Sequence, residues 1–422
     1  MSIVEPLSPS GLIKPSSPPR VSPATVVGPH VERLCLHEAS IRWGDEWEDF
    51  LRSHGTGTPS VWPEAISEET RQPSRPGQIK SQCLGMWEGS SLRGLALLPG
   101  KMTARRTLLT PFPWDRLQGM RLAGNQIFTD GQEETLSGLM DEVGRELRRQ
   151  KARFLLIEDL ETNTPLHREI QRLQRQGFHW CWDTEPQPRF RIRMPETAEQ
   201  YWGTFSSKSR YNLRRQDRRM EETKLVCFTT PEQVGTFLEQ AAHVSRNSWQ
   251  QERIGTRIRN DDHEQRHLRS LAAKGHLNCY VLMQRSDPAA FLLGMRDERT
   301  FYYEEIGYDR KYAEYSPGTV LLFKAINHLY ETKLVEWFDF GFGDAPYKRL
   351  FANHQTESGK GWLLPPGLSA WELHMTFKAC KLSQRWGRAL LARLGWLQKL
   401  RQQSRRGGSK TSAVSPSSPE EG

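Results

Sequence analysis

Carboxylates interrupt an aromatic strand near residue 300, in the stretch that runs from Phe301 to Lys348. The segment FYYEEIGY (301–308) is predicted to be a strand, and Asp309 follows it directly. A charged side chain on a central strand is uncommon, because a buried charge must be paired or hydrogen-bonded. Glu304 or Glu305 is therefore a candidate general base, with Asp309 close behind. A salt bridge to one of the chain's many arginines is the alternative interpretation.

A second predicted strand, LVEWFDF (334–340), carries Asp339 and runs into a turn that contains Gly341 and Gly343. The pair Tyr347–Lys348 follows this turn. Polar groups at the strand ends of an α/β unit are where such folds hold their chemistry. Asp339 is therefore a candidate site residue, and capping the backbone of the glycine turn is the alternative role.

A helix is predicted between the two strands, and its start is Ser316–Pro317–Gly318–Thr319. Proline at the first helical position, preceded by serine, is a favourable way to begin a helix. The order strand, turn, helix, strand, turn places the polar residues of this stretch at one end of an α/β unit.

A basic helix is predicted from Lys208 to about Glu222. Arg210, Arg214 and Arg218 recur at intervals of four residues, and so lie on one side of it. Like charges at this spacing destabilise a helix slightly, so an anionic partner is one interpretation. A solvated face paired with nearby acids is the other. Nucleic-acid binding is disfavoured, because Tyr211 is the only aromatic residue within the basic run.

The composition is that of a folded protein, with 36% hydrophobic residues and 14 tryptophans in 422 residues. The net charge of +9 favours contact with something anionic. Six scattered cysteines without a C-x-x-C pair favour reduced thiols in a cytosolic protein. We expect no signal peptide and no membrane-spanning segment.

The predicted fold class is α/β (α+β), with two halves of similar plan. In the first half, SQCLGMWEG and SLRGLALLP are expected to be strands joined at Gly89–Ser90, and MRLAGNQIF another strand. In the second half, three strands form a meander that precedes the helix after Ser316. The expected organisation is a disordered Pro/Ser-rich lead (1–30), a first half (31–194), a second half (195–365), a basic amphipathic helix (366–403) and a disordered tail (404–422).

Two helical patterns admit more than one function. His263 and His267 match H-E-x-x-H, a zinc-protease signature, but Arg266 lies inside the motif and no third ligand follows, so we expect no metal site. In the C-terminal helix an apolar pattern begins at Trp371 and Met375 among many basic residues. Such a helix binds an anionic membrane surface or a partner, or packs on its own domain.

The segments FSSKSRYNLRRQDRRMEE, IGYDRKYAEYSPGTVLL and FDFGFGDAPYKRLFA, taken in order, resemble the CelD-type acyltransferases of the GNAT superfamily. This family is found near cellulose and exopolysaccharide genes and is related in fold to the FemAB-type aminoacyltransferases, which join two GNAT-like halves. The resemblance covers roughly residues 34–365 and is strongest in the second half. It implies a tandem GNAT-like fold with disordered termini.

The resemblance also implies a reaction: acyl transfer, with acetyl expected, from acyl-CoA to an amine or hydroxyl of a sugar or polysaccharide precursor. The attack is expected to be direct, with acyl-CoA as co-substrate and no permanently bound cofactor. Two alternatives stay open, namely FemAB-like transfer from aminoacyl-tRNA and a non-catalytic role in polysaccharide export. The expected location is cytoplasmic, with peripheral contact at the inner membrane face left open through the C-terminal helix.

On this reading each candidate residue takes a role. The expected catalytic residues are Glu304, Asp309, Asp339 and Tyr347, of which Tyr347 would protonate the leaving thiolate. The cofactor pyrophosphate would lie at Ser316, Gly318 and Thr319, since a helix start favours anions. This loop departs from the superfamily pattern, because it offers one glycine instead of two. The acceptor, a small or carrier-linked anion, would be held by Arg210, Arg214, Tyr308 and Lys348.

Overall fold

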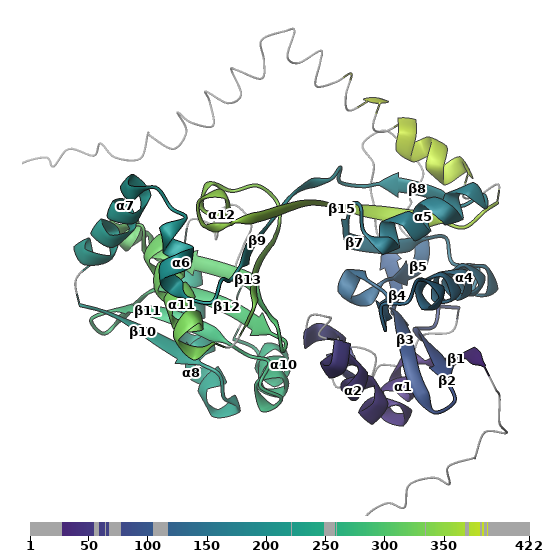
Figure 1. Cartoon of the computed structure of the whole chain (residues 1–422), viewed down its shortest axis with the longest axis horizontal. Helices are drawn as coiled ribbons and strands as arrows, with labels where there is room; N and C mark the ends of the chain where they lie inside the picture. Colours follow the sequence, from purple (N-terminus) through teal and green to yellow (C-terminus); the bar gives the residue numbers. More distant parts are fainter. Residues whose placement is uncertain are drawn as a thin grey trace, which may run out of the picture.

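The computed structural model describes two lobes joined along one side by a pair of long strands (Figure 1). It describes residues 28–54, 59–63, 65–66, 77–103, 117–220, 222–248, 258, 260–333, 335–367, 371–379, 382–383 and 386. The expected disordered tail lies outside these residues, as does the expected lead apart from residues 28–30, of which Pro29 and His30 begin a strand. Within them, no helix is long and apolar enough to cross a membrane.

The N-terminal lobe contains a four-stranded antiparallel sheet with helices on both faces. Its strands are β1 (Pro29–Cys35), β2 (Gln82–Glu88), β3 (Ser91–Leu98) and β6 (Phe128–Thr129). One face is covered by α1 (Leu36–Arg42), α2 (Gly44–His54) and the short turn η1 (Pro59–Val61), and the other by α4 (Glu133–Arg149). Next to this sheet are β4 (Gly100–Thr103), β5 (Leu117–Arg121), η2 (Ala123–Asn125), β7 (Leu155–Glu161), α5 (Pro165–Arg175) and β8 (His179–Trp182).

The C-terminal lobe has three layers, with helices on both faces of its sheet. Side chains of the strands point into one or the other of two hydrophobic cores. Its strands are β10 (Thr223–Phe228), β11 (Cys279–Gln284), β12 (Asp287–Arg296), β13 (Thr300–Tyr308) and β14 (Trp337–Phe342). One core lies under α6 (Ala198–Gly203), α7 (Ser207–Arg219) and α11 (Pro317–Thr332), and the other under α8 (Val234–Arg246) and α10 (Asp262–Ala273). Three short elements complete the lobe: η3 (Pro231–Gln233), η4 (Arg310–Tyr315) and α12 (Pro346–Phe351).

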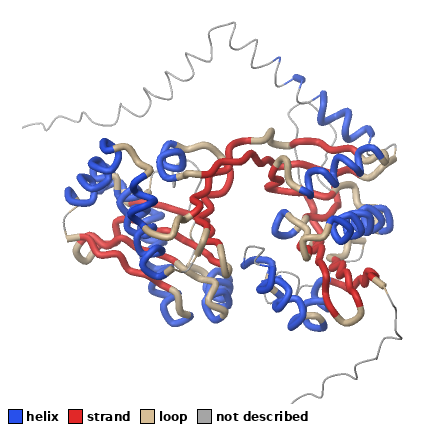
Figure 2. The backbone as a smooth tube through the Cα atoms, in the orientation of Figure 1, coloured by secondary structure: helices blue, strands red, loops and turns tan. Residues whose placement is uncertain are grey.

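Two strands cross between the lobes and join β4, β5, β7 and β8 to the strands of the C-terminal lobe in one eleven-stranded sheet, which does not include the four-stranded sheet (Figure 2). The first, β9 (Gln187–Arg193), follows the N-terminal lobe in sequence but pairs with β14 of the C-terminal lobe. The second, β15 (His354–Leu364), pairs with β9 over residues 354–358 and then with β7 and β8. The expected boundary between the halves lies at 194–195. β9, before this boundary, pairs with a strand of the C-terminal lobe, and β15, after it, pairs with strands of the N-terminal lobe.

Side chains along FYYEEIGY do not alternate strictly between the two faces of the sheet. Regular alternation would place Tyr302, Glu304, Ile306 and Tyr308 on one face, and this prediction is wrong. The register of β12 against β13 shifts between Leu293 and Gly294, and leaves Glu304 as the extra residue of a β-bulge. Phe301 and Tyr303 before the bulge, and Ile306 and Tyr308 after it, pack on the same core. A bulge adds one residue to one strand, so the face that each side chain occupies changes there.

The strand predicted for MRLAGNQIF is also wrong as a single element. It is divided into the end of β5, the turn η2 and the two-residue strand β6. Gly124 has φ of 69°, a conformation that glycine adopts readily and that a continuous strand excludes. The strands β2 and β3 and their turn at Gly89–Ser90 are confirmed.

We predict that Gly361→Ala destabilises the protein by about 1–3 kcal/mol, because the new methyl group must displace a packed ring. Gly361 lies on the part of β15 that completes the N-terminal lobe, and a Cβ built there is 2.0 Å from Cζ2 of Trp180. Gly203→Ala is the matched control, since its Cβ meets nothing within 4 Å. Urea unfolding of both variants measures the difference. Equal stability of the two would contradict this account of β15.

Candidate active site

The parallel strands β13 and β14 separate soon after they meet. Their pairing covers three residues, from Thr300 opposite Trp337 to Tyr302 opposite Asp339. Beyond this point β13 bulges at Glu304 and continues to Tyr308 without pairing to β14. The helix α11 begins beside the separated part of β13, where a Cβ on Gly318 would lie 3.8 Å from Ile306 and Tyr308. The start of α11 therefore lies beside the part of β13 that no longer pairs with β14.

Glu304 lies at the bulge, with its side chain reachable by solvent. Protein atoms nevertheless crowd around it, so desolvation raises the pKa of its carboxyl group, and the charge of Asp339 raises it further. A carboxyl group with a raised pKa holds a proton more readily than an ordinary surface glutamate.

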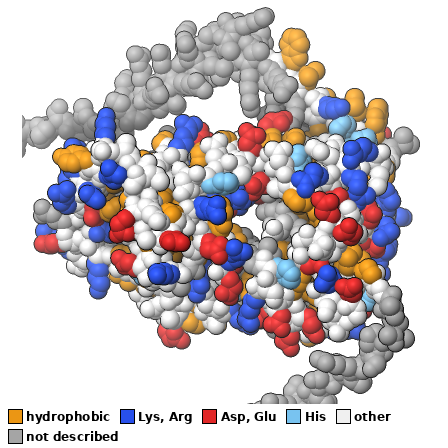
Figure 3. Space-filling model, in the orientation of Figure 1, with side chains coloured by type: hydrophobic (Ala, Val, Ile, Leu, Met, Phe, Trp, Pro, Cys, Tyr) orange, Lys and Arg blue, Asp and Glu red, His pale blue; other side chains and the backbone are white. Residues whose placement is uncertain are grey.

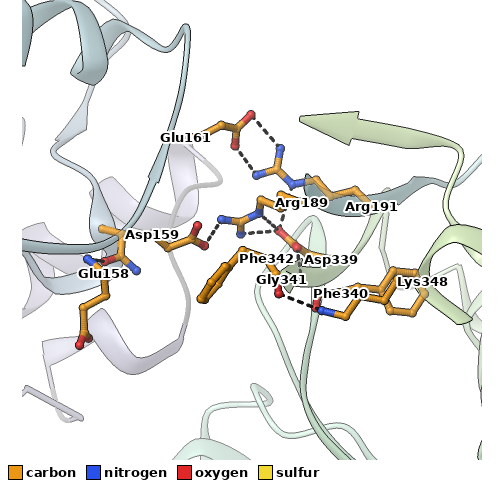
Figure 4. Close-up of polar contacts among 11 residues, drawn as sticks. Glu158, Asp159, Glu161, Arg189, Arg191, Asp339, Phe340, Gly341, Phe342 and Lys348 are labelled. Carbon is orange, nitrogen blue, oxygen red and sulfur yellow. Dashed lines mark hydrogen bonds and ion pairs between the residues drawn. The ribbon is translucent and has the colours of Figure 1, made fainter. Parts of the chain in front are cut away.

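Asp339 on β14 is the centre of an ion network that joins three strands (Figure 4). Its Oδ2 accepts hydrogen bonds from Arg189 Nη2 at 2.6 Å and from Arg191 Nε at 3.0 Å, both on β9. Arg189 also pairs with Asp159, and Arg191 pairs with both carboxylate oxygens of Glu161, at 3.3 and 2.6 Å. Asp159 and Glu161 lie on β7, so the network crosses from one lobe to the other.

Asp339 stays ionised in this environment. Burial alone would raise the pKa of its carboxyl group, but the charges of Arg189 and Arg191 and the hydrogen bond from the Gly341 N–H outweigh burial and lower it. The Gly341 bond, at 2.7 Å to Oδ1, also caps the glycine turn. The capping role weighed as the alternative for Asp339 is therefore present, together with a pairing to two arginines that was not predicted for it.

Lys348 is directed into the same glycine turn (Figure 4). Its ammonium group donates to the carbonyl oxygens of Phe340 at 2.7 Å and Phe342 at 3.0 Å, and the residue is buried. Burial lowers the pKa of Lys348. The turn needs glycine, because Gly341 and Gly343 have φ of 69° and 94°. Lys348 thereby fixes the end of β14.

Tyr347, one residue earlier on α12, contacts β13. Its hydroxyl lies 2.9 Å from that of Tyr303, and both rings pack near Phe340. Tyr303 was not predicted as a site residue, although its place in an aromatic strand beside two glutamates was a signal. The two phenols lie between β13 and the end of β14.

Asp309 and Tyr308 end β13. The carboxylate of Asp309 accepts from the Lys311 N–H at 3.0 Å and from Asn247 Nδ2 at 3.1 Å, and so caps η4. Asp309 is buried, whereas Tyr308 is partly exposed and packs on the core under α11. Asp309 therefore has a structural partner at each of its two oxygens.

The helix start predicted to bind phosphate is present at α11. Ser316 adopts a left-handed conformation with φ of 56°, and its carbonyl accepts from the Thr319 and Val320 N–H groups. Gly318 has room for a methyl group and an ordinary φ, so neither crowding nor strain explains the glycine. The first turn of a helix carries unpaired N–H groups that attract anions.

The basic helix α7 packs on α11 rather than on the separated strands. Arg210 Nη1 approaches the carbonyl oxygens of Trp202 at 3.5 Å and Gly203 at 3.4 Å, which places it at the α6–α7 junction. Arg214 is exposed. The structure therefore brings together Glu304, Asp339, Tyr347 and Lys348, while Arg210 and Arg214 lie elsewhere.

Arg189 and Arg191 are the residues of this region that the sequence analysis missed. The signal was the run PRFRIRM, in which arginines at 189, 191 and 193 alternate with apolar residues and so share one face of a strand. Its destination in the other lobe's sheet could not be read from that pattern. Within the described ranges, no group of three or more His, Cys, Asp and Glu side chains is placed to hold a metal ion.

Comparison with known proteins agrees with this geometry. Residues 207–349 match the family described as acetyltransferase (GNAT) domain. The crystal structure of FemX aligns with a TM-score of 0.56 at 13% identity, over 78% of this chain and 98% of FemX. The C-terminal domain of a protein assigned as a lysylphosphatidylglycerol synthetase from Agrobacterium fabrum aligns with a TM-score of 0.50 at 11% identity, over 79% and 95% of the two chains. No curated protein sequence matches the chain.

The chain has a two-lobed α/β fold like that of FemX, as expected from the sequence. More particularly, residues 207–349 match a GNAT acetyltransferase domain, and this match identifies the chain as an acyltransferase enzyme. The narrower CelD-type assignment is not confirmed by these comparisons.

We predict that Asp339→Asn lowers the free energy of unfolding by about 3–5 kcal/mol at neutral pH, because two partly buried guanidinium groups lose the buried anion that they share. The folded-state pKa of Asp339 is lowered, so its contribution is complete above the unfolded value of about 3.9 and is lost as pH falls through the folded value. The difference between wild type and variant should therefore shrink below about pH 4.

The matched control is Asp344→Asn, which breaks an exposed ion pair with Arg349. We expect a loss of about 0–1 kcal/mol there. Denaturant unfolding over a pH series measures both variants. A loss at Asp339 no larger than at Asp344 would contradict the central position of this carboxylate.

Proposed function

We propose that this enzyme transfers an acyl group from acyl-CoA to an amine or hydroxyl group by direct attack. The observation that carries the proposal is the separation of β13 from β14 beyond Tyr302, with Glu304 at the bulge and the start of α11 beside the separated part of β13. The pantetheine arm of acyl-CoA, an extended chain with amide groups, would lie alongside β13 where it no longer pairs with β14.

In this proposal the phosphates lie at the start of α11. Gly318 would supply a backbone N–H group, and Ser316, Gly318 and Thr319 together form the positive end of the helix dipole, while the N–H groups of Ser316 and Thr319 already donate to the carbonyl oxygens of Ala313 and Ser316. The single glycine of this loop leaves room at Gly318, beside Ile306 and Tyr308, where the phosphates would meet the arm.

The proposed reaction has one chemical step. The acceptor nitrogen or oxygen forms a bond to the thioester carbonyl carbon while the carbon–sulfur bond breaks. Glu304 takes the acceptor's proton, directly or through water, and Tyr347 gives a proton to the departing thiolate, so that CoA leaves as a thiol. Tyr347 is hydrogen-bonded to Tyr303, from which it could regain that proton.

The other predicted site residues are proposed to act around this step. Asp339 and Lys348 would hold the end of β14 beside Glu304, and Asp309 would hold the turn that leads to α11. Tyr308 would face the acceptor. Arg210 and Arg214, on α7, are proposed to contact an anionic acceptor away from the separated strands.

For the acceptor we propose a sugar or polysaccharide precursor, on the basis of the resemblance to CelD-type enzymes. Transfer from an aminoacyl-tRNA is the second candidate, because the two-lobed fold is shared with FemX. The match of residues 207–349 to an acetyltransferase domain favours acyl-CoA as the donor. A cytoplasmic location is proposed as well, in keeping with that donor.

We predict that purified protein binds one acyl-CoA per chain and that Gly318→Asp abolishes this binding, since it places a carboxylate where the pyrophosphate would lie. The variant should fold, because an acidic residue in the first turn stabilises a helix. Gly318→Ala is the matched control and should bind normally, as its methyl group meets only ordinary contacts at 3.8 Å. Isothermal titration calorimetry measures all three proteins. Absence of heat with acetyl-, succinyl- and long-chain acyl-CoA would count against the proposal.

We predict that Glu304→Gln lowers kcat/KM by about 10²–10⁴-fold and removes the acidic limb of the pH–rate profile. A base must be deprotonated to act, and its raised pKa moves that limb above the ordinary glutamate value of about 4.3. Release of free thiol from acyl-CoA in the presence of candidate acceptors measures the rate. Glu305→Gln serves as the control on the neighbouring residue. If it removes the limb while Glu304→Gln retains it, Glu305 is the base instead.

A further inference from the structure

The C-terminal helix exposes apolar side chains that the catalytic proposal does not use. Among the described residues, nine large hydrophobic side chains are exposed, and four of them belong to the C-terminal segment, at described helical positions within 371–379, 382–383 and 386. These four, with exposed fractions of 53%, 44%, 59% and 72%, are Trp371, Met375, Leu382 and Trp386. We call them the apolar stripe. Hydrophobic side chains stand out on this part of the surface in Figure 3.

The apolar stripe lies on one side of the helix and is directed away from the protein. Trp371 and Met375 are one turn apart in the continuous helical stretch 371–379, and a regular helix as far as Trp386 would place all four positions within about 60° of arc. The opposite side is anchored: Leu373 is 2% exposed, and the ring of Phe377 lies 5.5 Å from that of Trp362 on β15. His374 adds a contact of 3.0 Å to Cys181 Sγ on β8. The helix therefore lies flat on the N-terminal lobe with the stripe outward.

The sequence around the stripe is strongly basic. Residues 371–403 contain seven Lys and Arg residues and a single acidic residue, Glu372. Lys378, which the structure describes, is exposed. A second copy of this chain would bring the same positive charge against itself, so the charge disfavours self-association through this segment. An anionic surface is the complementary partner.

We propose that the apolar stripe binds the surface of an anionic lipid bilayer. Tryptophan favours the boundary between headgroups and acyl chains, because its ring is apolar and its N–H is polar. A helix with a narrow apolar face and basic flanks lies in the plane of that boundary. The bilayer would hold the N-terminal lobe by the face that carries α5 and β8, near which the helix lies in Figure 1. This inference does not rest on the proposed acyl transfer.

The test is sedimentation of the full chain with vesicles of phosphatidylcholine, with and without phosphatidylglycerol. We expect binding to the anionic vesicles that weakens as salt is raised. Trp371→Ser with Trp386→Ser should reduce the partition coefficient by about tenfold or more, since apolar area that enters the bilayer is lost. Ile41→Ser is the matched control, because Ile41 is as exposed as Trp386, at 72%.

Three results would overturn the inference: no binding to anionic vesicles, equal binding by the double tryptophan variant, or an equal loss in Ile41→Ser. Light scattering gives a fourth. A dimer that dissociates in the double variant, without vesicle binding, would identify a second copy as the occupant.

Thermal unfolding should be unchanged in the double variant, since both side chains are exposed. Calorimetry with acyl-CoA should also be unchanged, so that failure here and failure of the proposed reaction are separate outcomes.

Discussion

The pairing of Asp339 with two arginines is the interaction on which the two-lobed arrangement depends. A carboxylate with 4% of its surface exposed would be too costly to bury alone. Arg189 and Arg191 compensate it, and they in turn need Asp159 and Glu161. Because these groups come from β7, β9 and β14, charge compensation is complete only when the strands of both lobes are together. The same pairing fixes Asp339 beside Glu304, so it connects assembly with the proposed chemistry.

A second contact closes the two lobes at the far end from the crossing strands. Lys274 at the end of α10 pairs with Glu48 on α2 at 2.9 Å, and the ring of His276 lies 4.3 Å from that of Trp62. Burial lowers the pKa of His276, which favours the neutral ring against the indole. Two lobes that are joined at both ends have little freedom to hinge. The proposed site between β13 and β14 therefore lies in a lobe that is connected to its neighbour at two places.

Local sequence patterns predicted the helices and strands of this chain better than they predicted which strands pair with one another. Helices and strands with clear periodicity were found from the sequence, because burial of one face dictates their spacing. The division of MRLAGNQIF and the bulge at Glu304 were missed, since both depend on a single residue that leaves the regular backbone. The arginines of β9 were visible as an alternating pattern. Their carboxylate partners were not, because strand pairing between distant segments is set by the whole sheet.

The exchange of strands also has a consequence for synthesis on the ribosome. β15 lies between β9 and β7 and is the last strand of the sheet to be made. Until Leu364 has left the exit tunnel, β7 has β5 as a neighbour but lacks β15 on its other side, and β8 lacks the strand with which it pairs. Domains made early in translation generally fold as units while later ones are still being made. In this chain the sheet β1-β2-β3-β6 contains only early strands, whereas β7 and β8 keep an open edge until the last strand is made.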